Sequence, residues 1–392
     1  MVRKQPSEKQ IEMLAAAFLA GEDKKPKEIA TQLGINAVDV SRYLKEARDK
    51  RYLMVEARFL PGGIDHDMME KVRQRVTRQE LEDKLNSMPG RPGQAPRVSL
   101  RVLLCGDERD ERKRMRKLGA LAAPLVRTLL LRSTSCGLTW GGMLESVVAG
   151  MRDMHCSVPW KKKEHIEFIP LSGEPLGGEP SSFSSSNLAR DLGLLANGDK
   201  YDAPSLAMVP AFVPDGFLKY EREGVWRLIE LVKAYHDIFG PHDAGSAVAR
   251  RVARSVPKAM KLDMILTSVG SLGKPLGFGL GILFDNMNIS YHVLKSLLAA
   301  EVGGVCIPRA DLTRAQREQL KTVQTSWTGL RLEHLEACAR LGERPLKGPP
   351  GVVVVSAGTN RATAVCELIK RGLVNHLIID DVLAEELEKA SR

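Results

Sequence analysis

Three short segments of this 392-residue chain combine glycine with hydroxyl or charged side chains in a way that could bind an anion. They are TWGGM at residues 139–143, SVGS at residues 268–271 and SAGTNR at residues 356–361. Glycine lets backbone N–H groups approach a ligand closely, and the positive end of a helix dipole favours a phosphate. Glycine between a strand and a helix is also ordinary turn chemistry, so one such loop is weak evidence. Three of them in one domain indicate a binding site.

Strand and helix patterns alternate from about residue 97 onward, and these elements would position the three loops. The predicted strands are residues 98–105, 133–139, 165–170, 205–213, 263–269 and 351–356. The predicted helices are residues 112–131, 187–195, 221–239, 244–256 and 360–371. Such alternation is typical of a Rossmann-like, doubly wound α/β fold with a mostly parallel sheet covered on both faces. Ligands bind to these sheets where the strands end at their carboxyl edges, and each of the three loops follows a predicted strand.

The first sixty residues follow an all-helical pattern. Apolar spacing predicts a helix over residues 8–19, Pro26 fits the first turn of a short second helix, and a third helix would cover residues 37–51. Gly34 allows a left-handed turn before the third helix, which Asn36 can cap. A short helix, a glycine-containing turn and a second helix make the helix-turn-helix layout, whose second helix enters the major groove of DNA.

The side chains expected to contact DNA lie along this predicted third helix. Those near its start would meet base edges and those further along would meet phosphates: Ala37, Val38, Ser41, Arg42, Lys45 and Arg48. Residues 52–59 alternate like a short strand and could form a wing. Three-helix bundles with a glycine turn also occur without DNA, and the charge of this region is only modestly positive.

Residues 61–96 have the composition of a helical connector followed by a linker. Residues 65–88 are polar and charged with a narrow apolar stripe, which fits either a dimer seam or a solvated spacer. The prolines and glycines of residues 89–96 mark a domain boundary. We therefore predict a helix-turn-helix domain at residues 1–60, this connector, and a large α/β domain at residues 97–392.

Segments at both ends of the chain resemble the SorC family of bacterial sugar-responsive transcription regulators. KEIATQLGI at residues 27–35 and VSRYLKEAR at residues 40–48 are similar to the helix-turn-helix of that family. RGLVNHLIID at residues 371–380 is similar to a stretch near the end of its effector domain. The glycine-containing loops and AEVGG at residues 300–304 are similar to further segments of that domain. The resemblance therefore covers both ends and most of the middle of the chain.

This resemblance implies a regulator whose α/β domain binds a sugar or sugar phosphate, oligomerises as a dimer or tetramer, and controls affinity for double-stranded operator DNA. It also implies that the domain is similar in fold to phosphosugar isomerases and deaminases. The matching positions give the implied effector-binding residues: Trp140, Gly141, Gly142, Met143, Gly270, Ser271, Glu301, Gly358 and Arg361.

Three positions depart from the family pattern. Met143 stands where the family usually has a threonine able to bond a phosphate, and Glu301 stands at an aspartate position. Arg361 replaces a lysine, which keeps the charge but changes its reach and shape. These departures leave open which effector binds and whether it is phosphorylated.

An isomerase-like domain also allows an enzymatic alternative, a phosphosugar-processing enzyme with an appended helix-turn-helix. Glu301, Asp285, His292 and Asp380 are its candidate acid–base groups. Structural roles compete with chemistry, because Asp380 would cap the last helix and His292 would be a core histidine. Since the spacing shows no acid–base pair, we expect a regulator without catalytic residues. A scaffold that uses the basic segments at residues 109–117 and 160–163 is a third possibility.

Composition sets the remaining expectations. The chain has 58 Lys and Arg residues against 48 Asp and Glu residues, and this net charge of +10 favours an anionic partner. The apolar runs are too short to span a membrane, and the acidic, amphipathic N-terminal segment does not resemble a signal peptide. The six cysteines lack metal-ligand spacing and indicate reduced core thiols in a cytoplasmic protein. We expect no cofactor and no metal site.

Overall fold

The computed structural model describes most of the chain. The described residues are 7–21, 24–49, 79–88, 97–106, 108–157, 165–174, 182–198, 201–213, 219–240, 256–273, 281, 290–342 and 348–390. The chain divides into two compact units, Met1–Ser87 and Met88–Arg392. The predicted wing, most of the predicted connector and linker, almost all of the predicted helix at residues 244–256, and the basic residues 160–163 lie outside the described residues. Within the described ranges, no helix combines the length and the apolar character needed to cross a membrane.

The first unit contains the three helices that the sequence predicts: α1 (Glu8–Gly21), α2 (Pro26–Leu33) and α3 (Ala37–Asp49). Their apolar faces share one core, in which Leu14, Ile29 and Val40 are fully buried. Amphipathic spacing explains this, because residues three or four apart lie on one helix face. A further helical segment at residues 79–86 belongs to the same unit.

The turn between α2 and α3 has the backbone that the sequence predicts. Gly34 adopts a left-handed conformation (φ 65°, ψ 31°), and its N–H donates to the carbonyl groups of Ala30 and Thr31. Asn36 then caps α3, because its Oδ1 accepts a hydrogen bond of 2.7 Å from the backbone N–H of Asp39. A residue with a Cβ would be strained at position 34.

A six-stranded sheet forms the centre of the second unit. Its strands are β1 (Ser99–Leu103), β2 (Ser135–Leu138), β3 (Glu167–Pro170), β4 (Met264–Thr267), β7 (Gly351–Ser356) and β8 (His376–Asp380). They follow the order β1-β8-β7-β4-β2-β3, and every pair of neighbours is parallel. All residues of β4 and β7 are buried, as expected for strands covered on both faces.

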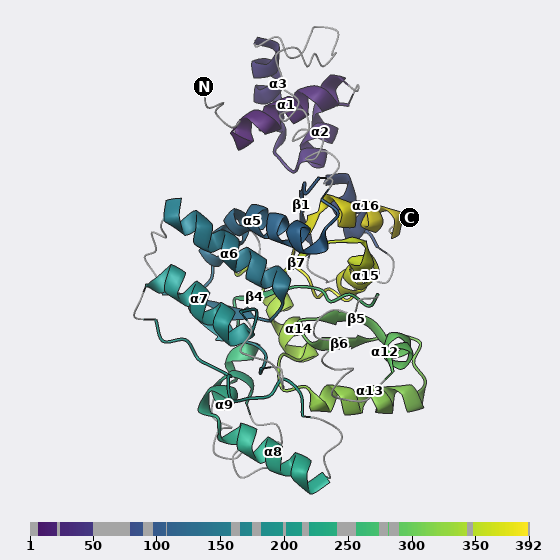
Figure 1. Cartoon of the computed structure of the whole chain (residues 1–392). Coiled ribbons are helices and arrows are strands. Elements are labelled where there is room, and N and C mark those ends of the chain that lie inside the picture. The colour runs from purple at the N-terminus through teal and green to yellow at the C-terminus, as the bar shows by residue number, and fades with distance from the viewer. Residues whose placement is uncertain are drawn as a thin grey trace. The chain divides into compact units, whose positions relative to one another are not determined.

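Helices cover both faces of this sheet. The described α-helices are α5 (Glu111–Leu130), α6 (Gly142–Ser157), α7 (Ser185–Asn197), α8 (Lys219–Leu231), α9 (Lys233–Phe239), α12 (Tyr291–Leu297), α13 (Arg314–Ser326), α14 (Leu332–Leu341), α15 (Ala362–Lys370) and α16 (Asp381–Ala390). Figure 1 shows α5, α6 and α7 stacked on one side of the sheet, with α14, α15 and α16 on the other. The second unit is therefore a three-layer α/β/α domain, in agreement with the predicted Rossmann-like class.

The predicted strand at residues 205–213 is wrong. This segment is an irregular loop, buried at Leu206, Val209 and residues 211–213 and exposed at Met208, in which Pro210 and Phe212 make isolated bridges to Glu174 and Trp327. Pro204 and Pro210 have no N–H group to donate to a strand ladder, so the segment cannot pair along its length. Most of its apolar residues are buried without forming a strand.

The predicted helix at residues 221–239 is two helices, α8 and α9, with Val232 in an extended conformation between them. Trp226 and Ile229 are buried in α8, and Tyr235 and Ile238 are buried in α9. Tyr235 follows Trp226 by nine residues, and Ile238 follows Ile229 by nine. In one continuous helix, residues nine apart would lie on roughly opposite faces. The break allows both sets of side chains to be buried.

A second, two-stranded sheet was not predicted. Strands β5 (Leu298–Val302) and β6 (Val305–Pro308) pair antiparallel around a turn at Gly303 and Gly304, which both have positive φ. A side chain on either glycine would collide with Thr139 or Trp327. The hairpin therefore packs closely against the loop that follows β2.

Cysteines occupy the interior, as expected for core thiols. The five cysteines whose side chains the structure describes are all buried and free: Cys105, Cys136, Cys306, Cys338 and Cys366. Burial raises the pKa of the Cys105 thiol to about 11, so this thiol stays protonated at neutral pH.

Candidate functional site

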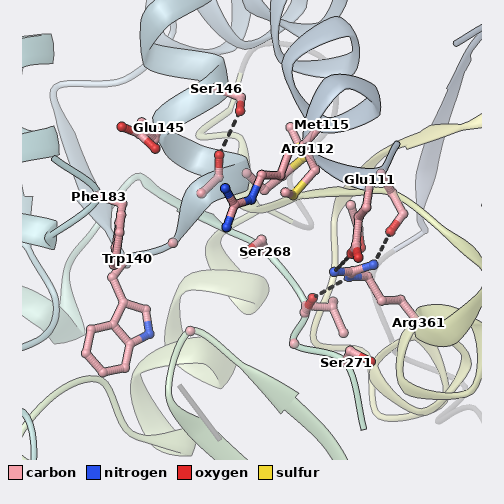
Figure 2. Close-up of a pocket in the computed structure, with 18 of the residues that line it drawn as sticks. Glu111, Arg112, Met115, Trp140, Glu145, Ser146, Phe183, Ser268, Ser271 and Arg361 are labelled. Carbon is pink, nitrogen blue, oxygen red and sulfur yellow. Dashed lines mark hydrogen bonds and ion pairs between the residues drawn. The ribbon is translucent and has the colours of Figure 1, made fainter. Parts of the chain in front are cut away.

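The strand order creates a crevice between β2 and β4. From β2 the chain passes to β3 on one side, then returns to β4 on the other side of β2. At such a switch point the loops that follow the two strands diverge and leave space for a ligand. A cavity of about 650 Å³ is lined by the loops that follow β2, β4 and β7 (Figure 2). We call it the switch-point cavity, and its size is typical of small-molecule sites.

Most of the effector-binding residues expected from the sequence surround this one cavity. Those that line it are Trp140, Gly141, Gly142, Met143, Gly270, Ser271, Glu301 and Arg361. Gly358 does not: it lines a neighbouring cavity of about 660 Å³, and its N–H donates to Asp380. Glu111, Asn360 and Arg361 line both cavities. The fold thus brings together residues from four separate segments of the chain.

The loop after β2 presents a helix N-terminus to the switch-point cavity. Gly141 has a φ of 117°, and its N–H donates to the carbonyl of Phe183 at 3.0 Å. Gly142 begins α6, and the space where its Cβ would stand is open. The first backbone N–H groups of a helix have no acceptor within the helix, and the helix dipole makes this end positive. This wall is suited to an anionic group.

Trp140 is chiefly a core residue. It is only 4% exposed, and its ring lies 5.3 Å from that of Trp327 and 6.4 Å from that of Phe212. This aromatic cluster supports the hairpin turn at Gly304, which contacts the Trp327 ring. Trp140 therefore shapes the cavity wall through packing.

Glu301 and Gly270 depend on one another. A Cβ at position 270 would lie 1.7 Å from Glu301 Oε2, so only glycine fits beside this carboxylate. Glu301 Oε1 accepts a hydrogen bond of 2.5 Å from the N–H of Gly304. Burial raises the pKa of Glu301 to about 7, although this hydrogen bond and the charge of Arg361 act in the opposite direction.

Arg361 joins three parts of the cavity wall. Its Nε donates to the carbonyl of Val269 at 3.2 Å and its Nη1 to that of Ala357 at 2.5 Å. Its Nη2 forms an ion pair of 2.8 Å with Glu111, in the first turn of α5. With a side chain only 14% exposed, Arg361 braces the loops after β4 and β7 against α5 (Figure 2).

The basic start of α5 is a part of the cavity that the sequence analysis did not assign to the site. Glu111, Arg112, Met115 and Arg116 line the switch-point cavity, and Figure 2 shows the Arg112 side chain extending into it. The sequence carries a signal for this, because two arginines four residues apart share one helix face. The alternative that residues 109–117 serve a scaffold does not anticipate this place in the cavity wall.

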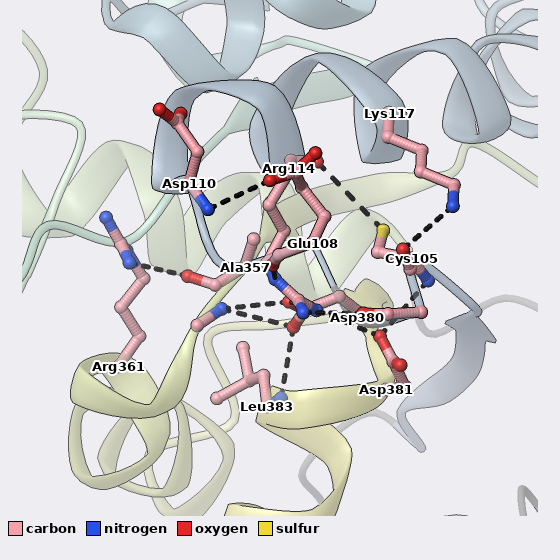
Figure 3. A network of polar contacts seen from close by, with 12 residues as sticks. Cys105, Glu108, Asp110, Arg114, Lys117, Ala357, Arg361, Asp380, Asp381 and Leu383 are labelled. Carbon is pink, nitrogen blue, oxygen red and sulfur yellow. Dashed lines mark hydrogen bonds and ion pairs between the residues drawn. The ribbon is translucent and has the colours of Figure 1, made fainter.

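Asp380 organises the neighbouring strand ends. Its buried carboxylate forms an ion pair of 3.1 Å with Arg114 and accepts hydrogen bonds from the backbone N–H groups of Gly358 and Leu383 (Figure 3). The bond from Leu383 confirms the predicted cap of the last helix. Arg114 also contacts Asp381, which binds the N–H of Cys105. The carboxylate of Asp380 is thus committed to structure.

The other two acid–base candidates are His292 and Asp285. His292 lies on α12 and is exposed, so the expectation of a core histidine is wrong. The reason is that the face of α12 that packs inward carries Leu294 and Leu297. Asp285 lies outside the described residues.

The first unit presents a second candidate surface, the outer face of α3. Ala37, Val38, Ser41, Arg42 and Lys45 are exposed there, and Val38 is 76% exposed although it is apolar. The Arg42 guanidinium pairs with Asp39 at 2.5 Å and lies over the Tyr43 ring. Arg48 lies in the last turn of α3.

Comparisons with known proteins point to fold alone. No protein-family model matches the sequence, and no curated protein matches it. The full-length sorbitol operon regulator SorC from Klebsiella pneumoniae has a similar structure, with a TM-score of 0.53 and 15% identity over 97% of this chain and 99% of that one. This chain shares its fold.

Two further regulators resemble a smaller part of the chain. A DeoR family transcriptional regulator from Listeria monocytogenes has a TM-score of 0.53 and 14% identity, over 80% of this chain and 99% of its own. A transcriptional regulator from Streptococcus pneumoniae has the same TM-score and identity, over 82% of this chain and all of its own. The likeness to SorC is the more extensive, since it covers nearly the whole of this chain.

Proposed function

We propose that this protein is a DNA-binding transcriptional regulator of the SorC type, whose affinity for operator DNA is controlled by a carbohydrate effector, a phosphorylated sugar. The observation that carries the proposal is the fold likeness to a full-length sorbitol operon regulator over 97% of the chain. Two candidate sites in one chain support it: the exposed face of α3, and the switch-point cavity.

The DNA-binding part of the proposal rests on α2, the Gly34 turn and α3, which we interpret as a helix-turn-helix. Ala37, Val38, Ser41 and Arg42 would meet base edges, and an exposed valine suits the methyl group of thymine. The Arg42–Asp39 pair is exposed and therefore weak, so the guanidinium can exchange it for a base or a phosphate. Lys45 and Arg48, further along the helix, would contact phosphates.

The effector-binding part rests on the switch-point cavity. Of the residues expected from the SorC resemblance to bind the effector, all but Gly358 line this cavity: Trp140, Gly141, Gly142, Met143, Gly270, Ser271, Glu301 and Arg361. Gly358 lines the neighbouring cavity. The resemblance also implies a fold similar to that of phosphosugar isomerases. A dimer or tetramer would present two recognition helices to a palindromic operator. Effector binding that favours one arrangement of subunits then changes DNA affinity, typically by about 1–3 kcal/mol or roughly 5- to 150-fold.

One observation favours the enzymatic alternative: Glu301 is a buried carboxylate with a pKa raised to about 7 that lines the cavity. However, Glu301 Oε1 accepts a hydrogen bond from Gly304, and Oε2 packs against Gly270. One oxygen is thus hydrogen-bonded and the other is packed against the backbone of Gly270, and we assign Glu301 to structure and effector binding. Multiple turnovers of a phosphosugar by the pure protein would reverse this assignment.

The test is a selection of duplexes from a random DNA library by the full-length protein, followed by titration of the selected duplex with and without sugar phosphates. We expect one enriched, two-fold symmetric sequence and a change of roughly 5- to 150-fold in its affinity with the right effector. Failure to enrich any sequence would refute DNA regulation.

A further inference from the structure

The switch-point cavity has a surplus of positive charge on one wall, at the start of α5. Arg112 and Arg116 both line the cavity, and neither guanidinium has a hydrogen bond or ion pair among the residues that the structure describes. Their spacing of four residues puts them on one face of α5. Figure 2 shows the Arg112 side chain reaching into the cavity.

The other charged groups of the cavity already have protein partners. Each of its three carboxylates takes a hydrogen bond or ion pair from a protein group: Glu111 from Arg361, Glu145 from Ser182, and Glu301 from Gly304. All three nitrogens of the Arg361 guanidinium likewise donate to protein acceptors. An incoming anion would therefore meet Arg112 and Arg116 as its available cations.

Two more donors line the same cavity. Gly142 opens the 16-residue helix α6, and no atom lies within 4 Å of the position its Cβ would take. Independently, the hydroxyl of Ser356 is buried, with the residue only 1% exposed, and has no hydrogen-bond partner in the part of the chain that is described. Buried hydroxyls are nearly always paired, so this one in the cavity wall is available to a bound water or a ligand atom.

We propose that Arg112, with Arg116 beside it and the first amide groups of α6, binds the phosphoryl group of the effector and so selects phosphorylated over neutral sugars. Arg361, which the sequence pattern nominates for this contact, is a positioning residue that holds α5 against the loops after β4 and β7. The inference rests on the proposed function only in taking the effector to be a sugar. A planar guanidinium matches a phosphate with two hydrogen bonds, and a helix N-terminus adds to them.

The test compares Arg112→Gln with Lys113→Gln in the full-length protein. Lys113 is the neighbouring exposed cation on α5 but does not line the cavity, so it controls for the loss of one charge. The probes are inorganic phosphate at fixed ionic strength, glucose 6-phosphate and fructose 6-phosphate, each with glucose or fructose as the neutral match. Thermal denaturation and calorimetric titration give the affinities.

We expect the unaltered protein and Lys113→Gln to bind phosphate, and to bind at least one sugar phosphate more tightly than its neutral parent. Arg112→Gln should lose roughly 10- to 100-fold in affinity for these anions, the effect of one hydrogen bond to a charged group. The affinity of Arg112→Lys for these anions should lie between those of the unaltered protein and Arg112→Gln, because lysine keeps the charge but cannot form two parallel hydrogen bonds to a phosphate. A preserved melting temperature without ligand shows that each variant is folded.

Three results would overturn the inference: no binding of any phosphorylated probe by the unaltered protein, equal affinities in Arg112→Gln and Lys113→Gln, or neutral sugars bound as tightly as their phosphates. The same experiments distinguish failure of this inference from failure of the proposed function. If the protein selects no DNA sequence but Arg112→Gln loses phosphate, the anion site stands and DNA regulation falls.

Discussion

The face of α3 and the switch-point cavity are assembled in different ways. The α3 face comes from a single run of residues, and helix periodicity alone decides that Val38 and Arg42 are exposed on it. The cavity is built from segments far apart in the chain, such as Glu111 and Arg361, which are 250 residues apart. The first surface depends on local structure, whereas the second exists only when the sheet is complete.

The largest expected effect concerns the network that holds the cavity's strand ends. Replacing Asp380 with Ala leaves the Arg114 guanidinium and the N–H groups of Gly358 and Leu383 without their acceptor. We expect a loss of about 3–5 kcal/mol in the free energy of unfolding, as for other broken buried ion pairs. Chemical denaturation measures it. Asp311→Ala, which breaks an exposed pair with Arg309, is the control and should change little; equal effects would contradict the structural role of Asp380.

Next in size is the loss of a base contact from α3. Arg42→Ala should weaken binding to the selected operator by about 1–3 kcal/mol, the range of one good contact to a base, while effector affinity stays the same. Fluorescence anisotropy with labelled duplex measures the first quantity and calorimetry the second. Lys9→Ala on α1 is the matched removal of an exposed cation from the same unit. Unchanged operator affinity in Arg42→Ala would remove this side chain from the groove.

Arg361→Ala should affect the response to effector in the cavity without affecting DNA binding by α3. It releases Glu111 from the loops after β4 and β7, so we expect effector control of DNA affinity, about 1–3 kcal/mol, to disappear while basal DNA binding survives. Operator titrations with and without effector measure the difference. An effector response as large as in the unaltered protein would show that this brace has no part in the coupling.

A last prediction concerns the pH dependence of stability that comes from Glu301 in the cavity wall, which we expect to be small within any one pH unit. The pKa of Glu301 is raised from 4.5 to about 7, so its burial destabilises the fold progressively as pH rises between these values, by at most about 1.4 kcal/mol per pH unit. His334 and His376, whose pKa values burial lowers to about 4, act with the opposite sign: each favours the fold as pH rises from about 4 to 6.5.

Comparison with Glu301→Gln isolates the carboxylate, because both histidines remain. The difference in melting temperature between Glu301→Gln and the unaltered protein should shift in favour of the variant from pH 5 to pH 7.5. A constant difference across this range would mean that Glu301 does not titrate there.

Much of the fold follows from local patterns. Strand β7 has the predicted bounds, and β2 and β4 lie inside predicted strands, because buried parallel strands are short runs of apolar residues. The failures have tertiary causes. Leu206, Val209 and residues 211–213 are buried in a loop beside Glu174 and Trp327, and α8 and α9 separate because their apolar faces point in different directions.

The candidate site divides in the same way. The glycine loops at positions 141, 142 and 270 could be found because they follow strands in the sequence. Arg112 could not be assigned from its own neighbourhood, where it is one cation of a basic run. Its place in the cavity depends on α5 crossing the sheet so that its first turn reaches the loop after β7.

The sequence by itself determined the three N-terminal helices, the left-handed turn at Gly34 and the strand–helix alternation, since each depends on interactions within a few residues. Only the tertiary structure decided which glycines meet at the switch point, that Gly270 makes room for Glu301, and that Arg361 is engaged by the protein while Arg112 is available. These contacts join residues far apart in the chain, and burial and strand order, which no local pattern encodes, bring them together.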